Sequence, residues 1–125
     1  MKKLTAIVVG AGNRADVYSS HALKHPDELQ IVGVVDPNPK RVKYFKDKFS
    51  ISEENCYSSL EELLKRDKFA DFVINGTMDQ LHVDTSIPLL EKGYDMLLEK
   101  PFAVNEEEMQ RLCDTADKYG NKIVI

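Results

Sequence analysis

The chain has 125 residues, 42% of them hydrophobic and 30% charged, which is long enough for one domain with a buried core. Its net charge of −4 argues against the basic surface that nucleic-acid binding needs, and no apolar run approaches the roughly 20 residues of a membrane span. The short apolar run before Gly10 lacks a cleavage-like site and predicts a strand rather than a signal peptide. Cys56 and Cys113 lie far apart and predict reduced thiols in a cytoplasmic protein, and we assign no metal site.

Apolar runs alternate with helical patterns from one end of the chain to the other. Taken in order, the predicted elements are a strand at 4–9, a helix at 14–24, a strand at 29–35, a helix at 38–49, a short strand at 55–57, a helix at 59–66, a strand at 71–75, a helix at 80–91, a strand at 94–98, a helix at 105–119 and a strand at 122–125. The helix boundaries rest on the caps Asn38, Ser59, Asp79 and Asn105, on a hydrophobic staple between Val104 and Met109, and on Gly93 and Gly120 at helix ends.

This alternation predicts the fold class. Strands joined by helices through short connections form a parallel sheet with right-handed crossovers. We therefore expect an α/β, doubly wound sheet of the Rossmann type, with strand order 3-2-1-4-5-6 and helices on both faces. The chain ends on a strand at Ile125 with no polar residues after it, so we expect residues 1–125 to be the first domain of a longer protein.

The segment after the first strand has the pattern Gly10-x-Gly12-x-x-Ala15. Gly10 permits a tight turn, Gly12 lets the backbone approach a pyrophosphate, and Ala15 still allows close helix–strand packing. The helix that follows directs unpaired N–H groups at phosphates. Arg14, in its first turn, is placed to add a charge-assisted hydrogen bond.

Asp36 ends the second strand at the spacing expected for an acid that binds the adenosine ribose. A carboxylate there accepts hydrogen bonds from the ribose hydroxyls and repels a 2′-phosphate, which favours NAD over NADP. Lys40 and Arg41 are close enough in sequence to keep NADP open. A plain turn followed by a surface aspartate is the bland alternative. A methyltransferase is another alternative, because it also combines a glycine loop with an acid after its second strand. It would not explain the segment Glu99-Lys100-Pro101.

Two further segments follow the fourth and fifth strands. Thr77 has a hydroxyl suited to a ribose or phosphate oxygen, while a lone histidine such as His82 is more often structural. Pro101 ends the fifth strand, which places Glu99 and Lys100 at the ligand-binding edge of the sheet. Lys100 is suited to stabilise a developing alkoxide or to move a proton, and Glu99 to orient it or to bind a ribose. An ordinary surface Glu-Lys pair is the alternative.

These motifs together resemble the N-terminal domain of the glucose–fructose oxidoreductase / inositol dehydrogenase / rhizopine-catabolism (Gfo/Idh/MocA) family. The resemblance covers essentially the whole chain and implies an NAD(P)-binding Rossmann domain followed by a substrate domain with an open, mostly antiparallel sheet. It implies an oxidoreductase acting on sugars, cyclitols or related alcohols. It also implies a catalytic role for Lys100, which would contact the substrate. The implied cofactor-binding residues are Gly10, Ala11, Gly12, Asn13, Arg14, Asp36, Thr77, Met78, His82, Glu99 and Lys100.

The chain departs from the family in two respects. Met78 and Asp79 stand where the family commonly has proline and asparagine, and the family's catalytic histidine belongs to the second domain. We therefore expect this chain alone to bind NAD weakly and to show no turnover, and the full-length protein to be a homo-oligomer. Two other functions stay open: an NAD-dependent glycosidase of the same superfamily, which the pair Asn13-Arg14 weakly resembles, and a non-catalytic dinucleotide-binding module.

Overall fold

The protein is an α/β domain built on a six-stranded parallel sheet. The computed structural model describes residues 4–10, 20–25, 27–76, 82–98 and 106–124. The strand order is β3-β2-β1-β4-β5-β6, and every neighbouring pair is parallel, which confirms the predicted topology. The strands are β1 (Leu4–Val9), β2 (Leu29–Val35), β3 (Cys56–Tyr57), β4 (Phe72–Asn75), β5 (Asp95–Leu98) and β6 (Ile123–Val124).

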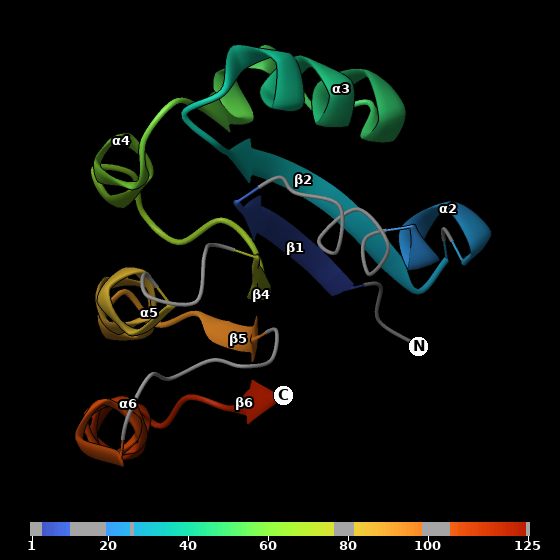
Figure 1. Ribbon diagram of the computed structural model, residues 1–125. Helices are drawn as coiled ribbons and strands as arrows, with labels where there is room; N and C mark the ends of the chain where they lie inside the picture. The colour runs from blue at the N-terminus through green and yellow to red at the C-terminus, as the bar shows by residue number, and fades with distance from the viewer. Residues whose placement is uncertain (1–3, 11–19, 26, 77–81, 99–105, 125) are drawn as a thin grey trace.

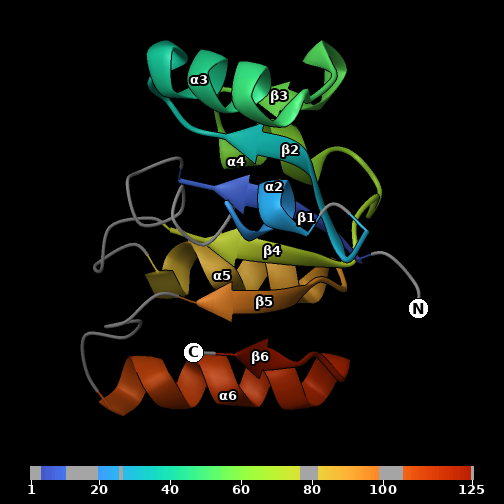
Figure 2. The same cartoon turned by 90° about the vertical axis from the view of Figure 1, so that its right-hand side faces the viewer.

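Helices cover both faces of the sheet, as predicted. In Figure 1, α4, α5 and α6 lie together on one side of the sheet, while α3 and α2 lie towards the other. Figure 2 shows α2 in front of β1 and all the strand arrows pointing the same way. The described helical segments are α2 (His21–Lys24), α3 (Pro39–Phe49), the 3-10 turn η1 (Glu53–Asn55), α4 (Leu60–Leu64), α5 (His82–Glu91) and α6 (Glu106–Tyr119).

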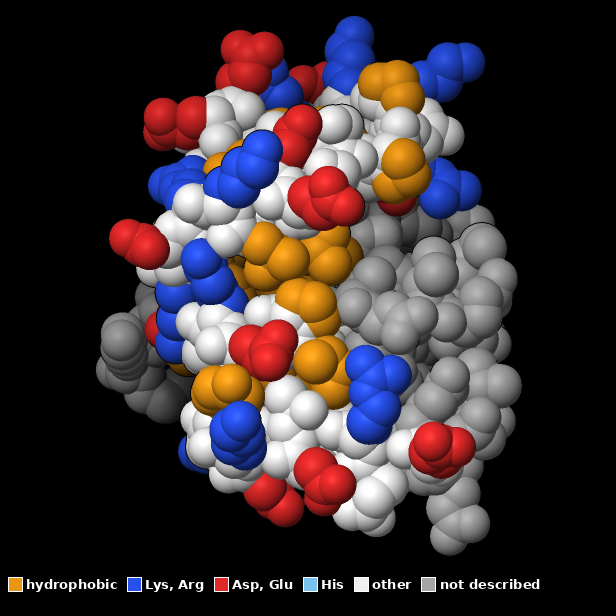
Figure 3. All heavy atoms as spheres, turned by 90° about the vertical axis from the view of Figure 1, so that its left-hand side faces the viewer, with side chains coloured by type: hydrophobic (Ala, Val, Ile, Leu, Met, Phe, Trp, Pro, Cys, Tyr) orange, Lys and Arg blue, Asp and Glu red, His pale blue; other side chains and the backbone are white. Residues whose placement is uncertain are grey.

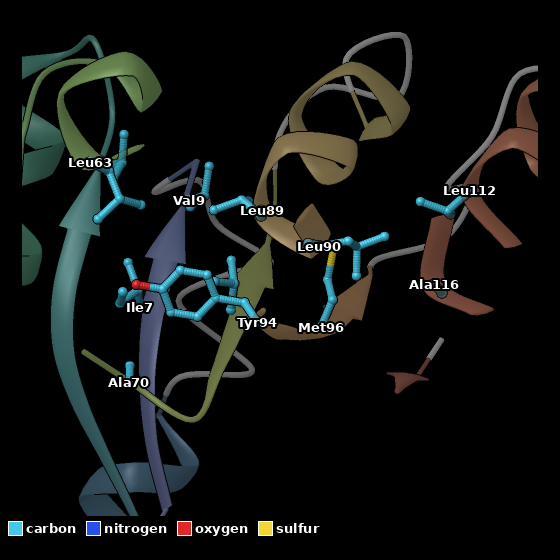
Figure 4. Close-up of a cluster of buried hydrophobic side chains, with 12 residues drawn as sticks. Ile7, Val9, Leu63, Ala70, Leu89, Leu90, Tyr94, Met96, Leu112 and Ala116 are labelled. Atoms are coloured by element: carbon cyan, nitrogen blue, oxygen red, sulfur yellow. The ribbon is translucent and has the colours of Figure 1, made fainter. Parts of the chain in front are cut away.

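Two hydrophobic clusters form the core, one on each face of the sheet. Successive residues of β1 alternate between them: Ile7 and Val9 join the cluster under α4, α5 and α6, whereas Ala6 and Val8 join the cluster under α3. Strands buried on both faces are almost continuously apolar, and Thr5 is accordingly the single polar residue of β1. Figure 4 shows the first cluster, with Tyr94 lying between the strands and the helix layer.

The outer surface of the α4–α6 layer mixes charged and apolar side chains. Figure 3 shows Lys, Arg, Asp and Glu side chains around a central band of apolar ones. Leu60, Leu64 and Ile87 of these helices are only partly buried and pack against the first cluster. Part of the apolar stripe with which these helices pack on the core thus stays accessible on this face, among the charged side chains.

The predicted boundaries are correct where a local signal ends the element. Asn38 caps α3, because its side chain accepts a hydrogen bond from the Lys40 N–H at 3.0 Å. Ser59 caps α4 in the same way through the Glu62 N–H. Gly93 and Gly120, with φ of 99° and 69°, follow α5 and α6 in the left-handed conformation that glycine favours.

Several boundaries differ from the prediction: β4, β5 and β6 each begin one residue later than expected, and two further differences have a clear cause. The helix expected to reach Arg66 ends at Leu64, because the Arg66 N–H donates to the Leu63 oxygen in a tighter turn and its guanidinium binds Asn55 and Tyr57. Asn55 lies in η1 rather than in β3, since its backbone N–H donates to the backbone oxygen of Ser52. The segment 14–19, Gln80, the Asp79 and Asn105 caps and the Val104 side of the staple lie outside the described residues.

Both cysteines are free thiols, as predicted. Burial raises the pKa of the Cys56 thiol above its usual 9.0, an effect that the positive charge of Lys46 opposes. Within the described parts of the chain, no helix is long and apolar enough to cross a membrane. The same parts hold no group of His, Cys, Asp and Glu side chains arranged for a metal ion.

Candidate functional site

The carboxyl ends of four neighbouring strands are aligned across the sheet. Val35 of β2 pairs with Val9 of β1, Val9 pairs with Asn75 of β4, and Asn75 pairs with Leu98 of β5. Asp36, Gly10, Gly76 and Glu99 follow these residues directly in the sequence. The predicted motifs therefore start from one edge of the sheet, which is where open α/β folds bind ligands.

Gly10 turns the chain at the end of β1. Its φ is 83°, a conformation that residues with a Cβ seldom adopt, so glycine is required for the turn. Its N–H donates to the backbone oxygen of Val35 at 2.8 Å, which places it beside the end of β2, where Asp36 follows. The first glycine of the predicted pattern thus makes a tight turn directly after β1, as expected.

Asp36 is a carboxylate held at the end of β2 with only 4% of its surface exposed. Oδ1 accepts the Asn38 N–H at 2.8 Å, and Oδ2 lies 3.8 Å from Nη1 of the exposed Arg41. The backbone N–H of Asp36 donates to the backbone oxygen of Tyr57 in β3. These contacts fix the carboxylate in one orientation and offset part of the cost of its burial.

A cavity of about 450 Å³ opens beside Asp36, between α3 and the end of β3. Its volume is within the range of small-molecule sites. The wall combines apolar and charged groups. It is lined by Asp36, Pro37, Pro39, Val42, Lys43, Lys46, Asp47, Glu53, Cys56, Tyr57, Ser58 and Glu62.

The structure brings together Gly10 and Asp36, and it describes only the backbone at His82, the first residue of α5. The other predicted site residues lie outside the described residues. They are Ala11, Gly12, Asn13, Arg14, Thr77, Met78, Glu99 and Lys100.

One buried polar contact at this edge was not predicted. The Asn75 side chain at the end of β4 donates from Nδ2 to the Ser86 hydroxyl of α5 at 2.8 Å, and both residues are 0% exposed. An asparagine that ends an otherwise apolar strand was the available signal. Nothing in the sequence singled out Ser86 as its partner.

The parallel sheet in this order, the glycine turn after β1 and the buried acid after β2 define a dinucleotide-binding domain of the Rossmann class. Comparison with protein families agrees with this class. Residues 4–125 match the Gfo/Idh/MocA model, described as an oxidoreductase family with an NAD-binding Rossmann fold. The chain therefore belongs to this oxidoreductase family.

Individual relatives are dehydrogenases. The chain is 32% identical over 91 residues to a trans-1,2-dihydrobenzene-1,2-diol dehydrogenase of Xenopus tropicalis, a match covering 73% of this chain and 27% of the relative. It is 28% identical over 118 residues to D-glucoside 3-dehydrogenase of Escherichia coli, covering 94% of this chain and 32% of that enzyme.

Among solved structures, the chain is similar to the WlbA dehydrogenase of Chromobacterium violaceum, crystallised with NADH and UDP-GlcNAcA. The TM-score is 0.90 with 28% sequence identity, and the match covers 100% of this chain and 35% of that one. The chain thus spans about a third of the length of proteins that it resembles.

Proposed function

We propose that this chain is the NAD-binding domain of a longer dehydrogenase whose substrate is a sugar- or cyclitol-like alcohol. The family match and the dehydrogenase relatives support the reaction class. The substrate class is supported by the glucoside named for one relative and the nucleotide sugar acid bound to a similar structure. The structural observation that carries the proposal is the buried carboxylate of Asp36 beside the Gly10 turn.

Asp36 suits the adenosine ribose of NAD. Its oxygens are held by the Asn38 N–H and approached by Arg41, so the carboxylate is oriented before any ligand arrives. An oriented carboxylate accepts hydrogen bonds from vicinal hydroxyls without losing further side-chain entropy. The cavity at its side gives the rest of the adenosine room. A 2′-phosphate in the same place meets the negative charge of Asp36, which favours NAD.

The turn that Gly10 begins suits the pyrophosphate. With Gly10 in the left-handed conformation, the backbone leaves β1 sharply at the edge where Asp36 stands. We assign the pyrophosphate to the segment Gly10, Ala11, Gly12, Asn13 and Arg14. Backbone N–H groups at a helix start, together with one guanidinium, are the groups that bind phosphate oxygens.

The nicotinamide half is assigned to the ends of β4 and β5. Thr77, Met78, His82 and Glu99 follow those strands and would line that half of the ligand. NAD, when bound, supplies the acceptor for hydride from the carbinol carbon. Lys100 would hold the substrate oxygen and stabilise the negative charge that develops on it as its proton leaves.

The substrate-binding part of the enzyme is assigned to sequence beyond this domain. We expect the isolated chain to bind NAD and to produce no substrate-dependent NADH. In the full-length protein, Lys100→Ala should lower kcat with little change in NAD affinity. An unchanged kcat would remove Lys100 from the proposed chemistry.

The test of the domain's function is the Asp36→Ser variant. Losing a charged hydrogen-bond acceptor should weaken NAD about 10-fold or more and should reduce the preference for NAD over NADP. Serine still accepts the local backbone N–H, which limits the effect on the turn. The matched control is Asp117→Ser, an exposed acid on α6. NAD affinity is measured by calorimetry. If both variants bind NAD about as tightly as the unmodified chain, the proposal is contradicted.

A further inference from the structure

The described core contains three buried polar side chains: Asp36, Asn75 and Ser86. The proposed ribose contact accounts for Asp36. Asn75 and Ser86 bind each other through Nδ2 and Oγ at 2.8 Å, with 0% of either residue exposed. The two residues lie on β4 and α5, so this contact joins a strand to a helix.

Asn75 is the last residue of β4 and lies between Val9 of β1 and Leu98 of β5. The next residue, Gly76, donates its N–H to the Val9 oxygen at 2.8 Å, so the strand is held in register up to its end. Ser86 lies on α5, one helical turn after His82. The hydrogen bond therefore ties the end of β4 to the first turns of α5, on either side of the connection at 77–81.

Stability alone does not explain the pair. Burying an amide and a hydroxyl costs solvation that their hydrogen bond only partly returns, and a well-packed apolar pair of similar shape is often as stable. α5 also packs on the sheet through Leu89 and Leu90, both fully buried. A satisfied polar pair differs from an apolar one because it permits a single relative position of the two elements.

We propose that Asn75 and Ser86 are positioning residues that fix the start of α5 against the end of β4, and thereby set the affinity for the nicotinamide half of the dinucleotide. The inference rests on the proposed function, which assigns Thr77 and His82 to that half. It adds two buried residues that act through the position of α5. The adenosine and pyrophosphate contacts are assigned to residues that follow β1 and β2, so we expect changes to the pair to leave them unaltered.

The experiment compares two ligands, NAD and ADP, by calorimetry. ADP carries the adenosine and both phosphates but lacks the nicotinamide riboside. The double variant Asn75→Leu/Ser86→Ala replaces the polar pair with an apolar one, and Ser86→Ala alone removes a single oxygen. Both variants should fold. Both should weaken NAD about fivefold, the worth of roughly one net hydrogen bond, while ADP affinity stays unchanged.

Thr5→Val is the matched control. Thr5 Oγ1 donates to Asp71 Oδ2 at 3.2 Å and accepts the Asp71 N–H at 3.1 Å, so it joins β1 to the opposite end of β4. This variant should change the affinity for neither ligand. An equal loss of NAD and ADP affinity in the pair variants, or no loss of either, would overturn the positioning role.

Two other outcomes also decide the matter. Failure of the double variant to fold, judged by circular dichroism, would overturn the inference because the fold would then depend on the pair. Absence of NAD binding by the unmodified chain would overturn the proposed function as well. NAD binding that is insensitive to the pair would overturn only the positioning role.

Discussion

Gly33 shows how much a single residue without a side chain can matter inside a sheet. The pairing of β1 with β2 skips Val32, so that Ala6 pairs with Ile31 and Ile7 with Gly33. At this irregularity the neighbours close in on the glycine. A Cβ at Gly33 would lie 3.3 Å from the backbone oxygen of Asn55, from Ile7 Cγ1 and from Phe69 Cζ. Glycine inside a strand commonly marks such a close approach.

Gly33→Ala should therefore destabilise the domain by about 1–3 kcal/mol, the usual cost of overpacking a filled core. The measurement is the free energy of unfolding from denaturant titration, with an unchanged slope confirming that the folded state is the same. A variant as stable as the unmodified chain would show that the three neighbours give way freely.

Tyr94 is expected to make the free energy of unfolding depend on pH in the alkaline range. The residue is 1% exposed, and its phenol oxygen accepts the Phe69 N–H at 3.3 Å. Burial raises the pKa of the phenol above its ordinary 10.0, an effect that the Phe69 hydrogen bond and the charge of Arg66 partly oppose. The folded state thus holds the proton more tightly than the unfolded state does.

The contribution of the neutral phenol is fully present below about pH 10 and is lost as pH rises through the folded pKa. We expect the free energy of unfolding to fall above about pH 10, and to fall less steeply in Tyr94→Phe. Denaturant titrations at several alkaline pH values measure both slopes. Equal slopes would mean that other groups cause the alkaline loss.

At the scale of elements, α3 illustrates a helix whose start depends on one cap. Asn38 accepts the Lys40 N–H through its side chain, while its own N–H donates to Asp36. Asn38→Ala should cost about 1 kcal/mol of stability, because it leaves a helix N–H without its partner. Asn38→Ser keeps a capping oxygen and should cost less. Thermal unfolding distinguishes them, and equal losses would show that the cap contributes nothing.

Elements were predictable where the local sequence alone sets their ends. β1 and β2 have the predicted bounds because each is a mostly apolar run with a turn residue after it. The end of α4 was not predictable, because Arg66 leaves the helix to bind Asn55 and Tyr57. Those contacts join the turn after α4 to η1 and β3, and the helical periodicity of the sequence does not predict them.

The same distinction holds for the whole molecule and its candidate site. Gly10 and Asp36 were predictable because a backbone conformation and a ligand chemistry each demand one residue type at a set distance from a strand. The pairing of Asn75 with Ser86 was not, since it arises only when α5 packs on the sheet. The binding and catalytic roles of all the candidate site residues stay predictions: those at 10–14, Asp36, those at 77–78, His82, and those at 99–100.

The central claim is that this domain binds NAD at the edge formed by Gly10 and Asp36. The most direct measurement is calorimetric titration of the unmodified chain with NAD and with NADP. We expect saturable binding of one NAD per chain, with NADP weaker by about 10-fold or more because its 2′-phosphate meets the buried carboxylate. Tighter binding of NADP, or no heat from either ligand at millimolar concentration, would contradict the account.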